Sequence, residues 1–119
     1  MSTPVMLMVN ERVIPAVMND THAARDFMKR LPFHITMHRY SVDYCGTAAS
    51  GEFDPAETQN GWKNGDISLA GGWFALLFDG EEASQSYNGM MIIGHIDERD
   101  LPAVRNLSDT IRLTVALAE

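Results

Sequence analysis

Short apolar segments with a period of two recur along most of the chain, and this pattern limits its possible folds more than any other feature. In residues 33–40, Phe33, Ile35 and Met37 fall on one face, and mostly polar side chains fall on the other. Such alternation is typical of strands that bury one side. Similar apolar segments cover residues 5–9, 12–17, 67–70, 73–78, 90–96 and 111–118. The sequence therefore predicts seven or eight strands.

Two short stretches change to a helical period. Residues 24–31 place four apolar side chains at the i, i+3, i+4 and i+7 spacing of one helix face, and Pro32 ends the segment. Candidate N-caps precede this helix at Asn19, Asp20 and Thr21. A second helix of one or two turns is predicted where Leu101, Val104 and Leu107 face inward. Together these elements predict a mainly β, mostly antiparallel barrel or sandwich with short helices.

The length and composition of the chain fit one domain. With 119 residues and no internal repeat, linker or low-complexity tract, residues 1–119 are expected to fold around a single core. Hydrophobic residues make up 45% and charged residues 21%, close to the globular average, which excludes disorder and coiled coils. A core of this size needs neither a disulfide nor a metal to stay folded.

The charge narrows the expected partners. Asp and Glu outnumber Lys and Arg by 16 to 9, which gives a net charge of -7. Nucleic acids and anionic membranes bind proteins through basic surfaces, so neither is an expected partner. The start of the chain has no secretory-signal pattern, and no apolar stretch approaches about 18 residues, so a cytoplasmic location is expected. The one cysteine, Cys45, excludes an intrachain disulfide.

Several segments, taken in order, resemble those of a known family. They are the opening hairpin, Asn19–Pro32, Asp43–Thr47, Lys63–Ile67 with Gly72–Phe78, and Ile92–Asp97. Over nearly the whole chain they resemble the small bacterial cyclophilin-like domains. This resemblance implies a closed barrel with a helix covering an open end, and a surface cleft where true cyclophilins hold a proline-containing peptide. It brings no activity with it, because the small bacterial relatives mostly have no assigned function.

Arg39 is a candidate binding residue. It continues the inward face of residues 33–40, so its guanidinium either reaches the rim of the core or enters a cavity, where it could bind a carboxylate or carbonyl. True peptidyl-prolyl isomerases carry a Phe-His-Arg strand whose arginine stabilises the twisting amide, and Met37-His38-Arg39 is similar to it. The surrounding isomerase signature, with Gly-rich and Gln-containing stretches, is missing from this chain.

Aromatic side chains in and beside two polar loops are the other candidates. Residues 41–65 and 81–89 have no sustained period, and long loops in a compact domain are often functional. Aromatic residues commonly line the clefts that bind small ligands and peptides. Trp73 and Phe78 have opposite parity on one strand, so at least one of them is expected to face away from the cleft. The predicted binding residues are Arg39, Tyr44, Trp62, Phe78 and Tyr87.

The four histidines do not predict a metal site. His34 and His38 share a strand face but lie roughly 13 Å apart at the rise of a strand, too far to bind one ion. The acidic clusters at 79–82 and 97–100 lack the ligand spacing of a calcium loop, and phosphate-binding and dinucleotide-binding motifs are absent. No metal, cofactor or catalytic residue is therefore predicted.

Three functions stay open at this point. The leading prediction is a binding module that holds a small ligand or an extended peptide in a cleft of the barrel. The second is a weak peptidyl-prolyl isomerase in which Arg39 polarises the amide carbonyl. The third is an interaction subunit of a redox partner, because some relatives in this broad group are fused to flavodoxin-like domains. Either a monomer or a homodimer is expected.

Overall fold

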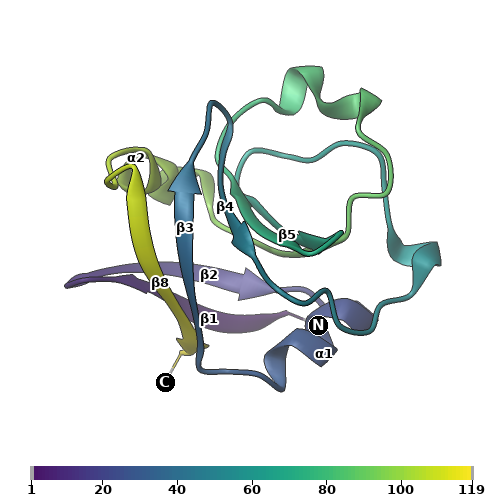
Figure 1. Cartoon of the computed structure of the whole chain (residues 1–119), viewed down its shortest axis with the longest axis horizontal. Coiled ribbons are helices and arrows are strands. Elements are labelled where there is room, and N and C mark those ends of the chain that lie inside the picture. The colour runs from purple at the N-terminus through teal and green to yellow at the C-terminus, as the bar shows by residue number, and fades with distance from the viewer. Residues whose placement is uncertain (1, 119) are drawn as a thin grey trace.

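The alternating segments pair edge to edge into a closed antiparallel barrel. The computed structural model describes residues 2–118, and its eight strands in this range are β1 (Thr3–Val9), β2 (Arg12–Met18), β3 (Phe33–Arg39), β4 (Asp43–Thr47), β5 (Asp66–Ala70), β6 (Trp73–Leu77), β7 (Ile92–His95) and β8 (Thr110–Leu117). Their order around the barrel is β1-β2-β7-β5-β6-β4-β3-β8, and β8 pairs with β1 to close it (Figure 1). This barrel confirms the predicted fold class. The predicted domain also includes residues 1 and 119, which lie outside the described range.

Short helices connect the strands. The α-helices are α1 (His22–Met28) and α2 (Leu101–Arg105), and the 3-10 helices are η1 (Pro55–Glu57), η2 (Glu81–Ser86) and η3 (Glu98–Asp100). Figure 1 shows α1 beside the start of β3 and α2 beside its end. Within residues 2–118, no helix is long and apolar enough to cross a membrane.

Tight turns join the strands that are neighbours in sequence. β1 and β2 pair along their whole length, from Thr3 opposite Met18 to Val9 opposite Arg12. Asn10 makes their turn with a φ of 56°, a left-handed conformation that asparagine adopts more readily than most residues. Two glycines with positive φ, at positions 71 and 72, turn β5 into β6. Both hairpins were predicted from the alternation and the turn residues, and both are confirmed.

The apolar faces of the strands form the core. In β3, Ile35 and Met37 point inward and are buried, whereas His34 and Thr36 are exposed. The register is strongly specified here, because a slip of one residue would bury the polar face and expose the apolar one.

Helix α1 closes the barrel near the start of β3. The ring of Phe27 is fully buried, with its centroid 5.0 Å from that of Phe33 and 5.4 Å from that of Phe74. Because these rings come from α1, β3 and β6, they join the helix to the barrel across its interior.

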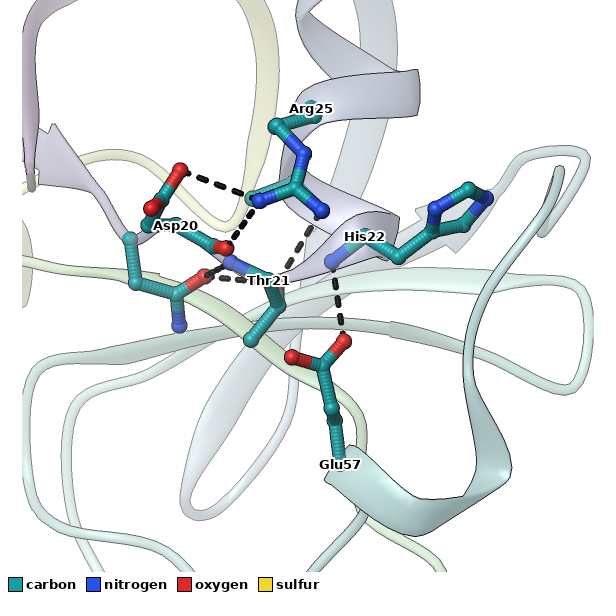
Figure 2. A network of polar contacts seen from close by, with 7 residues as sticks. Asp20, Thr21, His22, Arg25 and Glu57 are labelled. Atoms are coloured by element: carbon teal, nitrogen blue, oxygen red, sulfur yellow. Dashed lines mark hydrogen bonds and ion pairs between the residues drawn. The ribbon is translucent and has the colours of Figure 1, made fainter.

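The N-terminus of α1 also contacts the long loop that follows β4. Thr21 is the N-cap, and its hydroxyl accepts a hydrogen bond from the helix backbone. Arg25 donates to the carbonyl and the carboxylate of Asp20, and the backbone N–H of His22 donates to Glu57 at 2.9 Å (Figure 2). Glu57 belongs to η1, so this network fixes the loop against the helix.

Two elements are shorter than their apolar patterns suggest. The apolar run of residues 90–96 predicts one strand, but β7 covers only Ile92–His95, and Met90 instead pairs with Gln59 in an isolated bridge. The partner strand β5 shifts register between Ile67 and Ser68, which interrupts the ladder at that point. The helical stripe that runs to residue 31 predicts a longer helix than α1, which ends at residue 28.

Candidate functional site

The structure places the five predicted binding residues in two groups. The guanidinium carbon of Arg39 lies 5.6 Å from the ring centroid of Tyr44 and 4.9 Å from that of Phe78. Trp62 and Tyr87 form the second group, in the two long loops, with their ring centroids 5.2 Å apart. The two groups have different surroundings, which decide what each of them can bind.

Hydrogen bonds within the protein engage the Arg39 group. Nη1 of Arg39 donates to the carbonyl of Arg105 at 2.6 Å and to the hydroxyl of Tyr44 at 3.3 Å. Tyr44 is fully buried, and its hydroxyl oxygen lies 2.9 Å from the Leu107 carbonyl and 2.8 Å from the Ser108 carbonyl, so it donates its one proton to either. The guanidinium thus reaches the rim of the core and meets backbone groups there.

Arg105 completes this arrangement from α2. Its Nη2 donates to the carbonyl of Phe78 at 2.7 Å, and the buried ring of Phe78 lies 5.8 Å from that of Tyr44. Together these contacts hold α2 and the turn after it against the ends of β3, β4 and β6. Arg39, Tyr44 and Phe78 therefore stabilise one end of the barrel.

A hollow of about 420 Å³ lies on the outer face of β4, β6 and β5. Strand register builds its floor, because Cys45 on β4, Ala75 on β6 and Ser68 on β5 lie side by side in one row. The rows on either side are Asp43 with Leu77, and Trp73 with Ala70. We call this feature the outer-face hollow.

The two long loops build the wall of the outer-face hollow. The indole N–H of Trp62 donates to the carbonyl of Asp79 at 2.8 Å, and its backbone N–H donates to the hydroxyl of Ser84 at 3.0 Å. These bonds fix a ring that is only 7% exposed, while Tyr87 beside it is 57% exposed. A backbone hydrogen bond from Gly61 to Tyr87 joins the loops. The wall is thus a hydrogen-bonded aromatic surface with one accessible ring.

Three polar side chains line the outer-face hollow: Asp43, Cys45 and Ser68. Burial raises the pKa of the Asp43 carboxyl. Burial, together with the charge of Asp43, raises the pKa of the Cys45 thiol. The thiol therefore stays protonated near neutral pH and lacks the thiolate that nucleophilic attack or metal binding needs. The hollow offers hydrogen bonding and negative charge rather than a reactive sulfur.

Asp43 and Ser68 line the hollow although no sequence pattern marked them as binding residues, and of Trp73 and Phe78, which were weighed by parity, Trp73 is the one that lines it. The alternation in β4 contains part of the signal, because an inward Tyr44 places Asp43 and Cys45 outward. The position of Ser68 beside them is not readable in the same way, since β5 reaches β4 only through β6.

Other hollows lie elsewhere on the surface of the barrel. One of about 500 Å³ lies between the β1–β2 turn and the start of β8, and no aromatic residue is among the described residues that line it. An apolar groove of about 310 Å³ follows the outer faces of β1 and β2, with His95 at its edge. The imidazole Nδ1 of His95 lies 2.8 Å from a carboxylate oxygen of Asp66. Within residues 2–118, no three His, Cys, Asp or Glu side chains gather to hold a metal ion.

Replacing Asp43 by asparagine is expected to stabilise the protein at neutral pH. Because burial raises the pKa of this carboxyl, the folded state favours its protonated form. The wild type keeps this contribution to stability below the ordinary pKa of 3.8 and loses it as the pH rises through the raised value. In urea unfolding over a pH series, Asp43→Asn should have the same free energy of unfolding as the wild type around pH 3 and a higher one at neutral pH. The exposed Asp109→Asn makes the same charge change as a control, and an Asp43→Asn protein less stable than wild type at neutral pH would contradict this account.

Comparisons with known proteins agree on the fold. No curated protein matches the chain. The hypothetical protein AF2241 from Archaeoglobus fulgidus has 14% identity and a TM-score of 0.69, with 98% of this chain and 95% of that chain covered. McbB, solved in complex with tryptophan, has 12% identity and a TM-score of 0.66, and the match covers 95% of this chain but 44% of McbB. A model described as the cyclophilin-like family matches residues 7–116. The chain therefore belongs to the cyclophilin-like family.

Proposed function

We propose that this protein is a binding module that holds a small ligand or a segment of extended peptide in the outer-face hollow. The observation that carries the proposal is the combination of an aromatic wall with polar side chains on a mostly apolar floor. Small-molecule sites commonly have volumes of about 300–1,000 Å³, apolar linings and a few oriented polar groups. The outer-face hollow has all three features.

The geometry favours binding over prolyl isomerisation. An isomerase mechanism would need the Arg39 guanidinium free to polarise an amide carbonyl. One of its three nitrogens, Nη1, donates to Arg105 and Tyr44, and Arg39 is not among the residues that line the outer-face hollow. The role as an interaction subunit of a redox partner stays a prediction. The oligomeric state, monomer or homodimer, stays a prediction as well.

Changes in the chemical shifts of protein signals when a ligand is added test the proposal directly. The chain has two tryptophans, Trp62 and Trp73, and both line the outer-face hollow, so their indole N–H signals report on it. We expect members of a panel of aromatic compounds and short extended peptides to shift both signals. Tryptophan belongs in the panel because McbB, of which a part has a similar fold, has been solved in complex with it. Shifts confined to Met6 and Pro15 in the β1–β2 groove would contradict the proposed site.

Replacing Tyr87 by alanine is expected to weaken binding of any panel member found in this way by about twofold to tenfold, since an aromatic contact is worth about 0.5–1.5 kcal/mol. The matched control is Tyr40→Ala, because Tyr40 is 54% exposed and does not line the outer-face hollow. Affinities from chemical-shift titrations decide the comparison. If the two substitutions weaken binding equally, Tyr87 does not contact the ligand.

A further inference from the structure

Two polar groups in the outer-face hollow have no partner among the described residues. Ser68 is only 6% exposed and lines the hollow, yet its hydroxyl makes no hydrogen bond with them. The carboxyl of Asp43, half-buried in the row next to it, makes none either. Both groups face the hollow with hydrogen-bonding capacity that no described residue uses, so both are available to a ligand that enters it.

The charge around the hollow selects the kind of ligand. Among the described residues that line it there is no lysine or arginine, so Asp43 is its charged group. Burial raises the pKa of that carboxyl, and a cation beside it would offset the cost of desolvation. The net charge of -7 attracts cations to the surface, and the aromatic wall of Trp62 and Tyr87 also favours them.

The strand register sets the spacing of these groups. On β6, Leu77 in the Asp43 row and Trp73 in the row at the other end are four residues apart, or roughly 13 Å at the rise of a strand. Ser68 lies in the row between them. A ligand along the floor would thus meet a carboxylate first, a hydroxyl next and an aromatic ring last.

We propose that the outer-face hollow takes a primary amine with an aromatic or apolar body, with its ammonium group against Asp43 and a hydrogen-bonding atom against Ser68. This inference rests on the proposed function and names the ligand class for the same site. The ammonium donates to the carboxylate, and the body of the ligand covers Ala75 on the way to Trp73.

Three compounds with the same aromatic body test the role of charge: phenethylammonium, 2-phenylethanol and 3-phenylpropionate. Titrations followed by the indole N–H signals of Trp62 and Trp73 give the affinities in wild-type protein. We expect the ammonium compound to bind about tenfold more tightly than the alcohol, because an ammonium beside a partly buried carboxylate and aromatic rings gains the interactions that the alcohol lacks. The carboxylate compound should bind most weakly.

Variants separate the two polar groups. Asp43→Asn should remove the tenfold preference for the amine over the alcohol, whereas the equally charge-changing Asp109→Asn should preserve the preference. Ser68→Ala should weaken the binding of 2-phenylethanol about threefold, because it removes one hydrogen-bonding group. Since the Ser68 hydroxyl has no partner in the described protein, this variant should keep the wild-type melting temperature, which shows that the loss is not due to unfolding.

A comparison of two peptide ligands distinguishes a small free amine from the amino terminus of a peptide. Phe-Gly-Gly and its N-acetylated form differ only in the ammonium group, so binding of the free form alone would identify a peptide terminus as one source of the amine. Binding of phenethylammonium but neither peptide would restrict the ligand to small amines. Both results support the inference.

The outcomes also separate this inference from the proposed function. Equal or tighter binding of 2-phenylethanol or 3-phenylpropionate in the hollow would overturn the amine inference and leave the binding module intact. Retention of the amine preference in Asp43→Asn would also overturn it. If none of the three compounds shifts the two indole signals, the amine inference fails, and failure of the whole peptide and compound panel would reject the binding module as well.

Discussion

Replacing Phe27 by alanine is expected to lower the free energy of unfolding by about 3–5 kcal/mol, as large-to-small changes at buried aromatic sites usually do. The ring of Phe27 is fully buried and contacts those of Phe33 and Phe74, so its removal leaves a cavity between α1 and the barrel. The guanidinium of Arg30, 5.5 Å from the ring centroid, loses its aromatic contact as well. Urea unfolding followed by circular dichroism measures the loss.

Phe53 provides the matched control for this substitution. It is 46% exposed and lies in the loop after β4, so Phe53→Ala should change the free energy of unfolding by no more than about 0.5 kcal/mol. If Phe27→Ala is as mild as Phe53→Ala, then α1 does not close the core in the way that the structure describes.

Replacing Tyr44 by phenylalanine is expected to cost about 1–3 kcal/mol, because the change removes only the hydroxyl and leaves buried groups without their partner. The carbonyls of Leu107 and Ser108 lose their shared donor, and Nη1 of Arg39 loses one of its two acceptors. Thermal and urea unfolding should both show the loss. The binding of ligands in the outer-face hollow should not change, since Tyr44 does not line it.

Tyr87→Phe makes the same chemical change on an exposed ring. Tyr87 is 57% exposed, so loss of its hydroxyl should leave the stability within about 0.5 kcal/mol of wild type. A Tyr44→Phe protein with wild-type stability but weakened ligand binding would reverse our assignment, and would make Arg39 and Tyr44 part of the binding site.

Arg39 illustrates how far alternation can predict a site. Its parity in β3 correctly directs it toward the rim of the core. Parity cannot show which groups lie at that rim, because the carbonyl of Arg105 is 66 residues away in sequence. An arginine that looks free to bind a ligand in the sequence therefore stabilises the contact of α2 with the barrel.

Trp62 and Tyr87 illustrate the opposite case. Nothing periodic marks them in the sequence, and they were chosen as aromatic residues in polar loops. Backbone hydrogen bonds that join the two loops, together with the bonds of Trp62 to Asp79 and Ser84, turn these separate residues into one wall. The composition of the loops indicated a binding surface, but only the tertiary contacts determine its shape.

The sequence by itself determined the strands, the two hairpins and the positions of the helices, because each depends on local period, turn residues and caps, and because a slip of register would exchange the buried and exposed faces. Its patterns left a barrel and a sandwich both open, and the closed barrel was implied by the resemblance to a known family. The tertiary structure alone decided which outward residues share a row. Ser68 and Cys45 lie on strands that meet only through β6, and strand order depends on long-range pairing that local patterns do not specify. The outer-face hollow, with its unpartnered carboxyl and hydroxyl, is a product of that pairing.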